Sequence, residues 1–247
     1  MKSSERHKLK ENEFARRVAQ AREAIGARGR DISTILMVVV VALVMVGGYT
    51  WWRQSRNVKA NTKLAEALAV YEAPVVTVAA PAPGSPVPVQ QPGTYPTEQA
   101  KLEAALPKLV DAANAYPNTD AGIAARYQAA AVLSVVGRPA EAEQRYQEVL
   151  DKASRGSIYS RTAKLGQAEA QVAQGKYDSA IATYRELSVD SSAQLPVDGI
   201  LMHLGRACVK AGKKDDAVRA FNRVVEEFAQ SVYGADARRE LAEAKKG

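Results

Sequence analysis

The stretch GKYDSAIATY, residues 175–184, contains the pattern on which the fold depends. A glycine is followed five residues later by an alanine, and four residues after that by an aromatic residue. The same spacing occurs in GRPAEAEQRY (137–146) and in GKKDDAVRAF (212–221), so the three glycines are 38 and 37 residues apart. Repeats of this period are typical of stacked helical hairpins. The sequence therefore predicts an all-α chain built from a recurring helical hairpin.

Each position of the repeat has an expected role in packing. The glycine ends one helix, because it adopts a turn conformation that other residues resist. The small alanine on the next helix lets the two helices of a hairpin approach closely. The aromatic residue lies one turn further along the same face. We therefore expect Tyr146, Tyr184 and Phe221 to fill the space between one hairpin and the next.

The repeat resembles the tetratricopeptide repeat (TPR) over about residues 121–230. The first helices of the three units carry a small residue where that family has one, at Ala130, Ala168 and Gly205. The usual tryptophan of the first helix is absent, and Pro139 replaces an aromatic residue. The resemblance implies an α-solenoid of TPR-like hairpins. The matching residues are Gly137, Ala142, Tyr146 and Leu150, then Gly175, Tyr177, Ala180 and Tyr184, then Leu204, Gly205, Gly212, Ala217 and Phe221.

The flanks of the repeats extend the array in both directions. Residues 228–242 align with 116–130, which predicts a capping helix over 232–245 with a polar outer face. Residues 98–115 read as the second helix of a hairpin that lacks its first. We expect 57–72 to supply it, with the proline-rich segment 74–96 as a loop between the two. The alternative is that this segment is a plain tether.

A long uncharged stretch precedes the array. Asp31 and Arg53 are separated by 21 residues without charge, ten of them Ile, Leu or Val. About 20 apolar residues cross the hydrocarbon core of a bilayer as a helix. Tyr49, Trp51 and Trp52 cluster at one end, as in an interfacial aromatic belt. The stretch predicts a transmembrane helix over 32–52 rather than a buried soluble helix or a cleaved signal peptide.

The basic residues predict the orientation of this span. The chain has a net charge of +7, and residues 1–72 carry 13 Lys/Arg against 7 Asp/Glu. Nine of these basic residues precede the span and four follow it. The positive-inside bias predicts a cytoplasmic N-terminus with the C-terminal domain on the outer side, which at a bacterial inner membrane is the periplasm. A basic excess beside a span favours an anionic bilayer over nucleic acid as its partner.

The expected domain order follows from these features. Residues 1–31 form a basic tail, in which Phe14, Val18, Ala21 and Ile25 share a helical face that rests on the bilayer or binds a partner. The span over 32–52 continues as a helix over 53–73. Seven of the eleven prolines lie in the loop or linker 74–97, where they disfavour helix. The TPR-like domain occupies 98–247.

Signals of catalysis are absent from the sequence. It has two histidines, His7 and His203, and one cysteine, Cys208, which we expect to be a small buried residue. Neither a glycine-rich phosphate loop nor a His/Cys metal spacing occurs. We expect no enzyme, cofactor, metal or small-molecule substrate, and we interpret His203 as a scaffold residue.

The resemblance to TPR proteins implies a peptide-binding concave face lined by the first helices. These positions lack the lysine and asparagine of the dicarboxylate-clamp subfamily, so that mode of binding acidic tails is not expected. Arg206 and Lys210, one turn apart, either attract an acidic partner or form an ordinary solvated face. The expected face comprises Tyr127, Ala131, Leu165, Glu169, Met202, Arg206 and Lys210.

The whole arrangement is a short basic tail, one span and a short TPR array. It resembles the ancillary TPR subunits of the bacterial SecYEG translocon. That resemblance implies a membrane-anchored adaptor whose partners are translocon subunits or periplasmic chaperones. The alternative is a self-associating structural protein of cell-envelope assembly or division.

Overall fold

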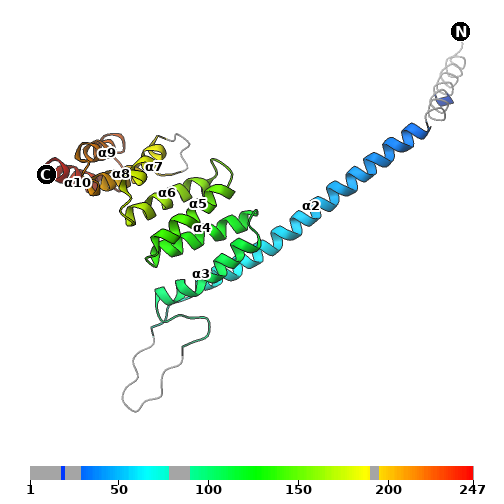
Figure 1. Ribbon diagram of the computed structural model, residues 1–247, viewed down its shortest axis with the longest axis horizontal. Coiled ribbons are helices and arrows are strands. Elements are labelled where there is room, and N and C mark those ends of the chain that lie inside the picture. Colours follow the sequence, from blue (N-terminus) through cyan, green and yellow to red (C-terminus); the bar gives the residue numbers. More distant parts are fainter. Residues whose placement is uncertain (1–17, 20–28, 78–89, 190–194, 247) are drawn as a thin grey trace, which may run out of the picture. The chain divides into compact units, whose positions relative to one another are not determined.

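The computed structural model describes residues 18–19, 29–77, 90–189 and 195–246, and the described part of the chain is almost entirely helical (Figure 1). It divides into two units, Met1–Ser55 and Arg56–Gly247, and each is considered by itself. The predicted all-α class is confirmed. The helices are α2 (Gly29–Tyr71), α3 (Glu98–Ala115), α4 (Asp120–Val135), α5 (Pro139–Lys152), α6 (Ile158–Ala173), α7 (Tyr177–Ser188), α8 (Val197–Lys210), α9 (Lys214–Glu227) and α10 (Gly234–Lys246).

The first unit contains the apolar part of α2. From Ser33 onward this helix is long and apolar enough to cross a membrane, with a mean hydropathy of 2.1 in its most apolar window. None of that window is buried, and the side chains of Ile35 to Val46 are exposed. By length and composition α2 is therefore a candidate span. The amphipathic face expected from Phe14, Val18, Ala21 and Ile25 lies outside the described residues, apart from Val18.

The second unit is a row of antiparallel helices in which each helix packs on the next along the chain, from α3 to α10 (Figure 1). The pairs α4/α5, α6/α7 and α8/α9 are the three hairpins expected from the repeat. Helix α10 packs on α9 at the place where a capping helix is expected. The α-solenoid of TPR-like hairpins is confirmed.

Local signals explain where these helices begin. The first helices α4 and α6 begin at side-chain caps, where Thr119 accepts a hydrogen bond from the Gly122 N–H and Ser157 accepts one from the Ser160 N–H. The second helices α5, α7 and α9 have no such cap and begin directly after the glycine turns.

The three repeat glycines end the first helix of each hairpin, as expected. Gly137, Gly175 and Gly212 have φ of 77°, 77° and 71°, a region that side chains with a Cβ rarely adopt. In each turn the next residue donates its N–H to the carbonyl five residues back, at 2.9 Å. This hydrogen bond closes the helix end and turns the chain into the second helix.

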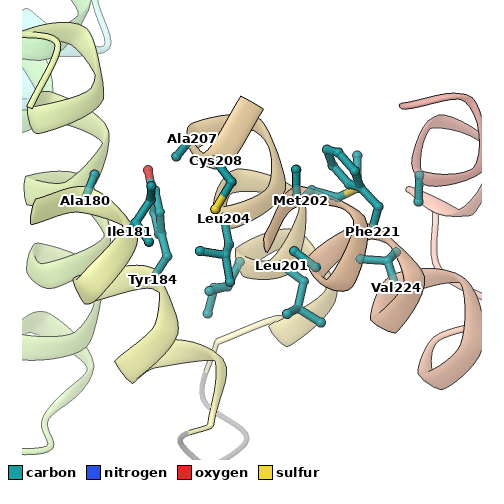
Figure 2. Close-up of a cluster of buried hydrophobic side chains, with 14 of the residues drawn as sticks. Ala180, Ile181, Tyr184, Leu201, Met202, Leu204, Ala207, Cys208, Phe221 and Val224 are labelled. Carbon is teal, nitrogen blue, oxygen red and sulfur yellow. The ribbon is translucent and has the colours of Figure 1, made fainter. Parts of the chain in front are cut away.

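The alanines and aromatics of the repeat form the contacts between helices. Ala142, Ala180 and Ala217 are fully buried, and the rings of Tyr146, Tyr184 and Phe221 are at most 4% exposed. Figure 2 shows the rings of Tyr184 and Phe221 on opposite sides of α8. The predicted stacking role of the spacing is confirmed, as is the burial of Cys208 in the same cluster.

Two of the rings fit against glycines of the first helices. A Cβ at Gly166 would overlap the ring of Tyr146, and a Cβ at Gly205 would overlap the ring of Phe221. The third ring, Tyr184, stacks instead on the imidazole of His203, with ring centroids 5.8 Å apart. Glycines on the first helices therefore set how closely two of the three aromatic rings approach.

The last turns of α2 supply the missing first helix of an additional hairpin. Ala67 is fully buried in one cluster with Leu102, Ala105 and Leu109 of α3. Lys63 of α2 forms an ion pair with Asp111 of α3. The expected pairing of 57–72 with 98–115 is confirmed by these contacts.

The two ends of the proline-rich segment are held together beside this hairpin. Val75 and Tyr95 form a parallel bridge, in which the Val76 N–H donates to the Tyr95 carbonyl at 2.8 Å and the Tyr95 N–H donates to the Pro74 carbonyl at 3.1 Å. Residues 78–89 lie outside the described part of the chain. These hydrogen bonds hold the two described ends of the segment side by side, as expected for a loop that closes on itself.

Candidate protein-binding face

The first helices α4, α6 and α8 carry the residues expected to line a binding face. The structure places Glu169, Arg206 and Lys210 at the surface and leaves Tyr127, Ala131 and Leu165 half-buried. We call these six residues the first-helix face. They include aliphatic, aromatic and charged groups, so the face can recognise side chains of several kinds.

Met202 differs from this expectation. Its side chain is 1% exposed and lies in the core cluster that includes Phe221 of α9 and Ala237 of α10. Figure 2 shows Met202 beside Phe221. The position matches Tyr127 and Leu165 in the repeat, but here α9 and α10 cover it. A partner cannot reach Met202 while these helices are packed.

Arg206 is accessible, but its charge is balanced within the chain. Its Nη2 donates to Glu240 Oε1 at 2.6 Å, its Nε donates to the same carboxylate at 3.0 Å, and Asp236 lies 3.9 Å away. The hydrogen bonds with Glu240 raise the pKa of Arg206. Because α10 supplies both carboxylates, Arg206 is not a free cation that would attract an acidic partner.

A groove of about 720 Å³ lies between α8 and α10, beside this ion pair. Lys210 and Lys214 line it without an ion-pair partner among the described residues, and Val209, which also lines it, is half-exposed. The volume is within the range of sites that hold a short segment or a small ligand. The groove is lined by Arg206, Val209, Lys210, Gly212, Lys214, Arg239, Glu240, Glu243 and Ala244.

Glu169 occupies a different environment on α6. His203 Nε2 lies 3.6 Å from its Oε1, and both side chains are partly exposed, 41% for His203 and 47% for Glu169. Partial burial raises the pKa of the Glu169 carboxyl, and the charge of His203, when protonated, opposes that shift. The carboxylate is thus partly desolvated and lacks a permanent cation beside it.

The charge of this carboxylate acts on tyrosines of three helices, α4, α5 and α7. The ring of Tyr127 lies 5.8 Å from that of Tyr146 and 6.1 Å from that of Tyr159, measured between centroids. Burial raises the pKa of the Tyr146 phenol to about 12, and the charge of Glu169 adds to the rise. The same charge contributes to the raised pKa values of Tyr127 and Tyr184.

Two residues of this region were not identified as site residues from the sequence. His203 was interpreted as scaffold, yet it lies beside Glu169 as well as stacking on Tyr184. Glu240 lies 34 residues beyond Arg206, about one repeat period, and that spacing was a usable signal for their contact. Within the described residues, no group of three or more His, Cys, Asp or Glu side chains is placed to hold a metal ion.

Comparison with known proteins agrees with this architecture. The sequence matches the family described as "Tetratricopeptide repeat-like domain" over residues 31–245. Two crystal structures of a Podosopora anserina putative kinesin light chain with nearly identical TPR-like repeats each give a TM-score of 0.52 at 16% identity. Each alignment covers 59% of this chain and 78% of that chain, and the likeness concerns the fold alone. No curated protein matches the sequence.

Proposed function

Because the chain belongs to the tetratricopeptide repeat-like domain family, we propose that it is a non-catalytic, membrane-anchored scaffold that binds partner proteins through its first-helix face. Repeats of this kind generally mediate binding to other proteins. The face supports the proposal because it places accessible charged groups beside half-buried aromatic and aliphatic ones. Such a mixture is typical of protein-binding surfaces.

The exposed apolar surface of α2 is the observation that supports anchoring in a membrane. From Ile35 to Val46 the described side chains lie uncovered, a surface far more apolar than water-exposed helices present. Tyr49, Trp51 and Trp52 at its end suit the interface between lipid and water. The basic residues before the span support an inner membrane of a bacterium, with the tail in the cytoplasm and the repeats in the periplasm.

Partner identity is proposed from the architecture. A basic tail, one span and a short TPR array resemble the ancillary TPR subunits of the SecYEG translocon, so translocon subunits or periplasmic chaperones are the proposed partners. The alternative, self-association in envelope assembly, receives less support from the described surface. The outer side of the capping helix is polar, with Arg238, Arg239 and Glu243 exposed, and offers no apolar face for a second array.

Photocrosslinking in intact bacterial cells tests the proposal. A photoreactive amino acid replaces Ala131 or Lys210 in the full chain, and the matched control carries it at Glu226 on the exposed side of α9. We expect the first two positions to capture translocon subunits or chaperones and the control to capture neither. Capture of the chain itself would support the alternative. Equal, unspecific capture from all three positions would contradict the use of this face.

A further inference from the structure

The groove between α8 and α10 continues the first-helix face to the last helix of the described chain. Residues 228–242 align with 116–130 of the repeat, so α10 occupies the position of a first helix. Helix α9 packs on both α8 and α10, and the ion pair of Arg206 with Glu240 joins these two helices beside the groove. The groove therefore lies between two successive first-helix positions of the array.

The lining of the groove is more positive than the rest of the repeat domain. Four of the lining residues are basic and two are acidic, which gives the lining a net charge of +2. Residues 73–247 as a whole carry 21 Lys/Arg against 20 Asp/Glu and are nearly neutral. The last turn of α10, directly after the lining residue Ala244, adds Lys245 and Lys246, and both are exposed. The groove therefore favours negatively charged ligands.

Ion pairs within the chain engage only part of this charge. Carboxylates of α10 hold both arginines of the lining. The other charged lining residues without an ion-pair partner among the described residues are Lys210, Lys214 and Glu243. Two free ammonium groups therefore remain in the groove against one free carboxylate.

Other lysines of the array have their charge balanced in the fold. Lys164, Lys176 and Lys213 each pair with a carboxylate of a neighbouring helix. Lys213 directly precedes Lys214 in the sequence, so the free charge of Lys214 is not a general property of this turn. An anionic group from outside could accept hydrogen bonds from Lys210 and Lys214 without displacing an ion pair that already exists.

The groove also offers apolar surface beside these lysines. Val209 is 53% exposed and precedes Lys210 on α8. The other uncharged lining residues, Gly212 and Ala244, add no polar side-chain atoms. A bare anion would leave this surface in water, whereas an apolar side chain would cover it. A ligand that satisfies the whole groove therefore carries acidic and apolar groups together.

We propose that the groove between α8 and α10 binds a segment of the partner protein in which acidic and apolar side chains alternate. Its acidic side chains pair with Lys210 and Lys214, and an apolar side chain covers Val209. The inference rests on the proposed scaffold function and names the partner chemistry at this end of the first-helix face. Unlike in a dicarboxylate clamp, the carboxylates belong to side chains within the segment. Arg206, which Glu240 already balances, takes no direct part.

Fluorescence anisotropy with defined peptides tests the inference. The full chain is placed in nanodiscs of zwitterionic phosphatidylcholine, so that no peptide is drawn to an anionic lipid. Three peptides of equal length carry the same dye and an amidated C-terminus. One alternates glutamate with leucine and serine, and the others have glutamine or lysine in place of glutamate. We expect the glutamate peptide to bind most tightly, with an affinity that falls as salt is added.

Three variants of the chain locate the binding. Lys210→Gln/Lys214→Gln should weaken the glutamate peptide about tenfold or more. Val209→Gln should weaken both the glutamate and the glutamine peptides, because it removes the apolar contact. Lys210→Glu/Lys214→Glu should lose the glutamate peptide and bind the lysine peptide instead, a reversal that a merely structural role of these lysines would not produce.

The matched control removes two charges elsewhere in the array. Lys108 on α3 and Lys152 on α5 are exposed and have no ion-pair partner among the described residues. Lys108→Gln/Lys152→Gln lowers the net charge by the same amount as the groove variant and should leave binding unchanged. Unfolding curves of every variant establish that the array is intact.

The outcomes distinguish the inference from the function on which it rests. Equal binding by the wild type and Lys210→Gln/Lys214→Gln would overturn the groove site, as would equal loss in the control or tighter binding of the glutamine peptide. If the groove variant also leaves unchanged the proteins captured from Ala131 in cells, the scaffold function stands and the groove site falls. If no partner is captured in cells from any position, the scaffold function falls, and the peptide data alone decide the groove site.

Discussion

Gly166 and the ring of Tyr146 show how single residues set the spacing between helices. Glycine in the middle of a helix costs about 1 kcal/mol relative to alanine, so propensity alone predicts that Gly166→Ala would stabilise the chain. A Cβ at this position would overlap the Tyr146 ring, which is itself buried between α4, α5 and α6. Packing therefore opposes helix propensity at this position. The two effects predict changes of opposite sign in the free energy of unfolding of Gly166→Ala.

We predict that Gly166→Ala lowers the free energy of unfolding by about 1–3 kcal/mol, because the buried ring cannot move aside without strain. Chemical denaturation of the full chain in detergent measures the change. Gly199→Ala is the matched control, since its Cβ would meet Tyr233 at 3.4 Å, an ordinary contact. A stabilised Gly166→Ala variant would show that the ring is free to shift.

The alanine and aromatic positions of the repeat give a second prediction at this scale. Tyr184→Ala should cost about 3–5 kcal/mol through the cavity left in the core, since the side chain is 1% exposed. Ala180→Leu should cost about 1–3 kcal/mol through overpacking. Ser179→Ala, at an exposed position of the same helix, should change the stability by less than about 0.5 kcal/mol. Unchanged unfolding of both core variants would be incompatible with the repeat register.

The Glu169 carboxyl gives a prediction about pH. Burial raises its pKa, so the folded chain holds this proton more tightly than the unfolded chain does, and ionisation of Glu169 destabilises the fold. Glu169→Gln is neutral at every pH and should therefore have the higher melting temperature at pH 7. The difference should shrink as the pH falls and Glu169 is protonated, and should vanish below about pH 4.

Melting curves of both proteins between neutral and acidic pH would measure this dependence. Glu226→Gln is the control, because that side chain is exposed on α9. A variant that melts below the wild type at pH 7 would mean that Glu169 has a stabilising cation after all.

At the scale of helices, the first hairpin shows how an unpaired surface identifies its partner. Residues 57–72 carry apolar side chains that need cover, and 98–115 read as a second helix without a first. The structure joins them through Ala67, Leu102 and Leu109 and through the ion pair of Lys63 with Asp111. In proteins most helical stability comes from packing of an apolar face, so these contacts rather than helix propensity account for the pairing.

Crosslinking tests this hairpin directly. Cysteines replacing Lys63 and Asp111 should react with a short bis-maleimide, because those side chains meet in an ion pair. The control pair combines Asp111→Cys with Glu72→Cys, which lies nine residues beyond Lys63, just past the end of α2, and hence about 13 Å further along the direction of the helix axis. With a protease site inserted within 78–89, the crosslinked chain should stay in one piece after cleavage. Separation of the fragments would favour a plain tether.

For the molecule as a whole, the sequence predicted the features that depend on local spacing. Gly175, Ala180 and Tyr184 lie within ten residues of sequence, so their spacing was enough to identify the repeat. Met202 was misplaced because its cover comes from α9 and α10, which no local pattern of α8 specifies. The contact of Glu169 on α6 with His203 on α8 joins two repeats, so it became visible only in the fold.

The orientation in the membrane is the last prediction, and the charge bias alone supports it. A cysteine replacing Val232, which is 89% exposed between α9 and α10, should be labelled by a membrane-impermeant maleimide in intact spheroplasts. A cysteine replacing Ser4 should be labelled only after the membrane is permeabilised. The native Cys208 is fully buried and is replaced by alanine in both variants to remove background. The bias of nine basic residues before the span over four after it favours a cytoplasmic tail. Labelling of Ser4→Cys but not Val232→Cys in intact spheroplasts would reverse the orientation and place the first-helix face in the cytoplasm.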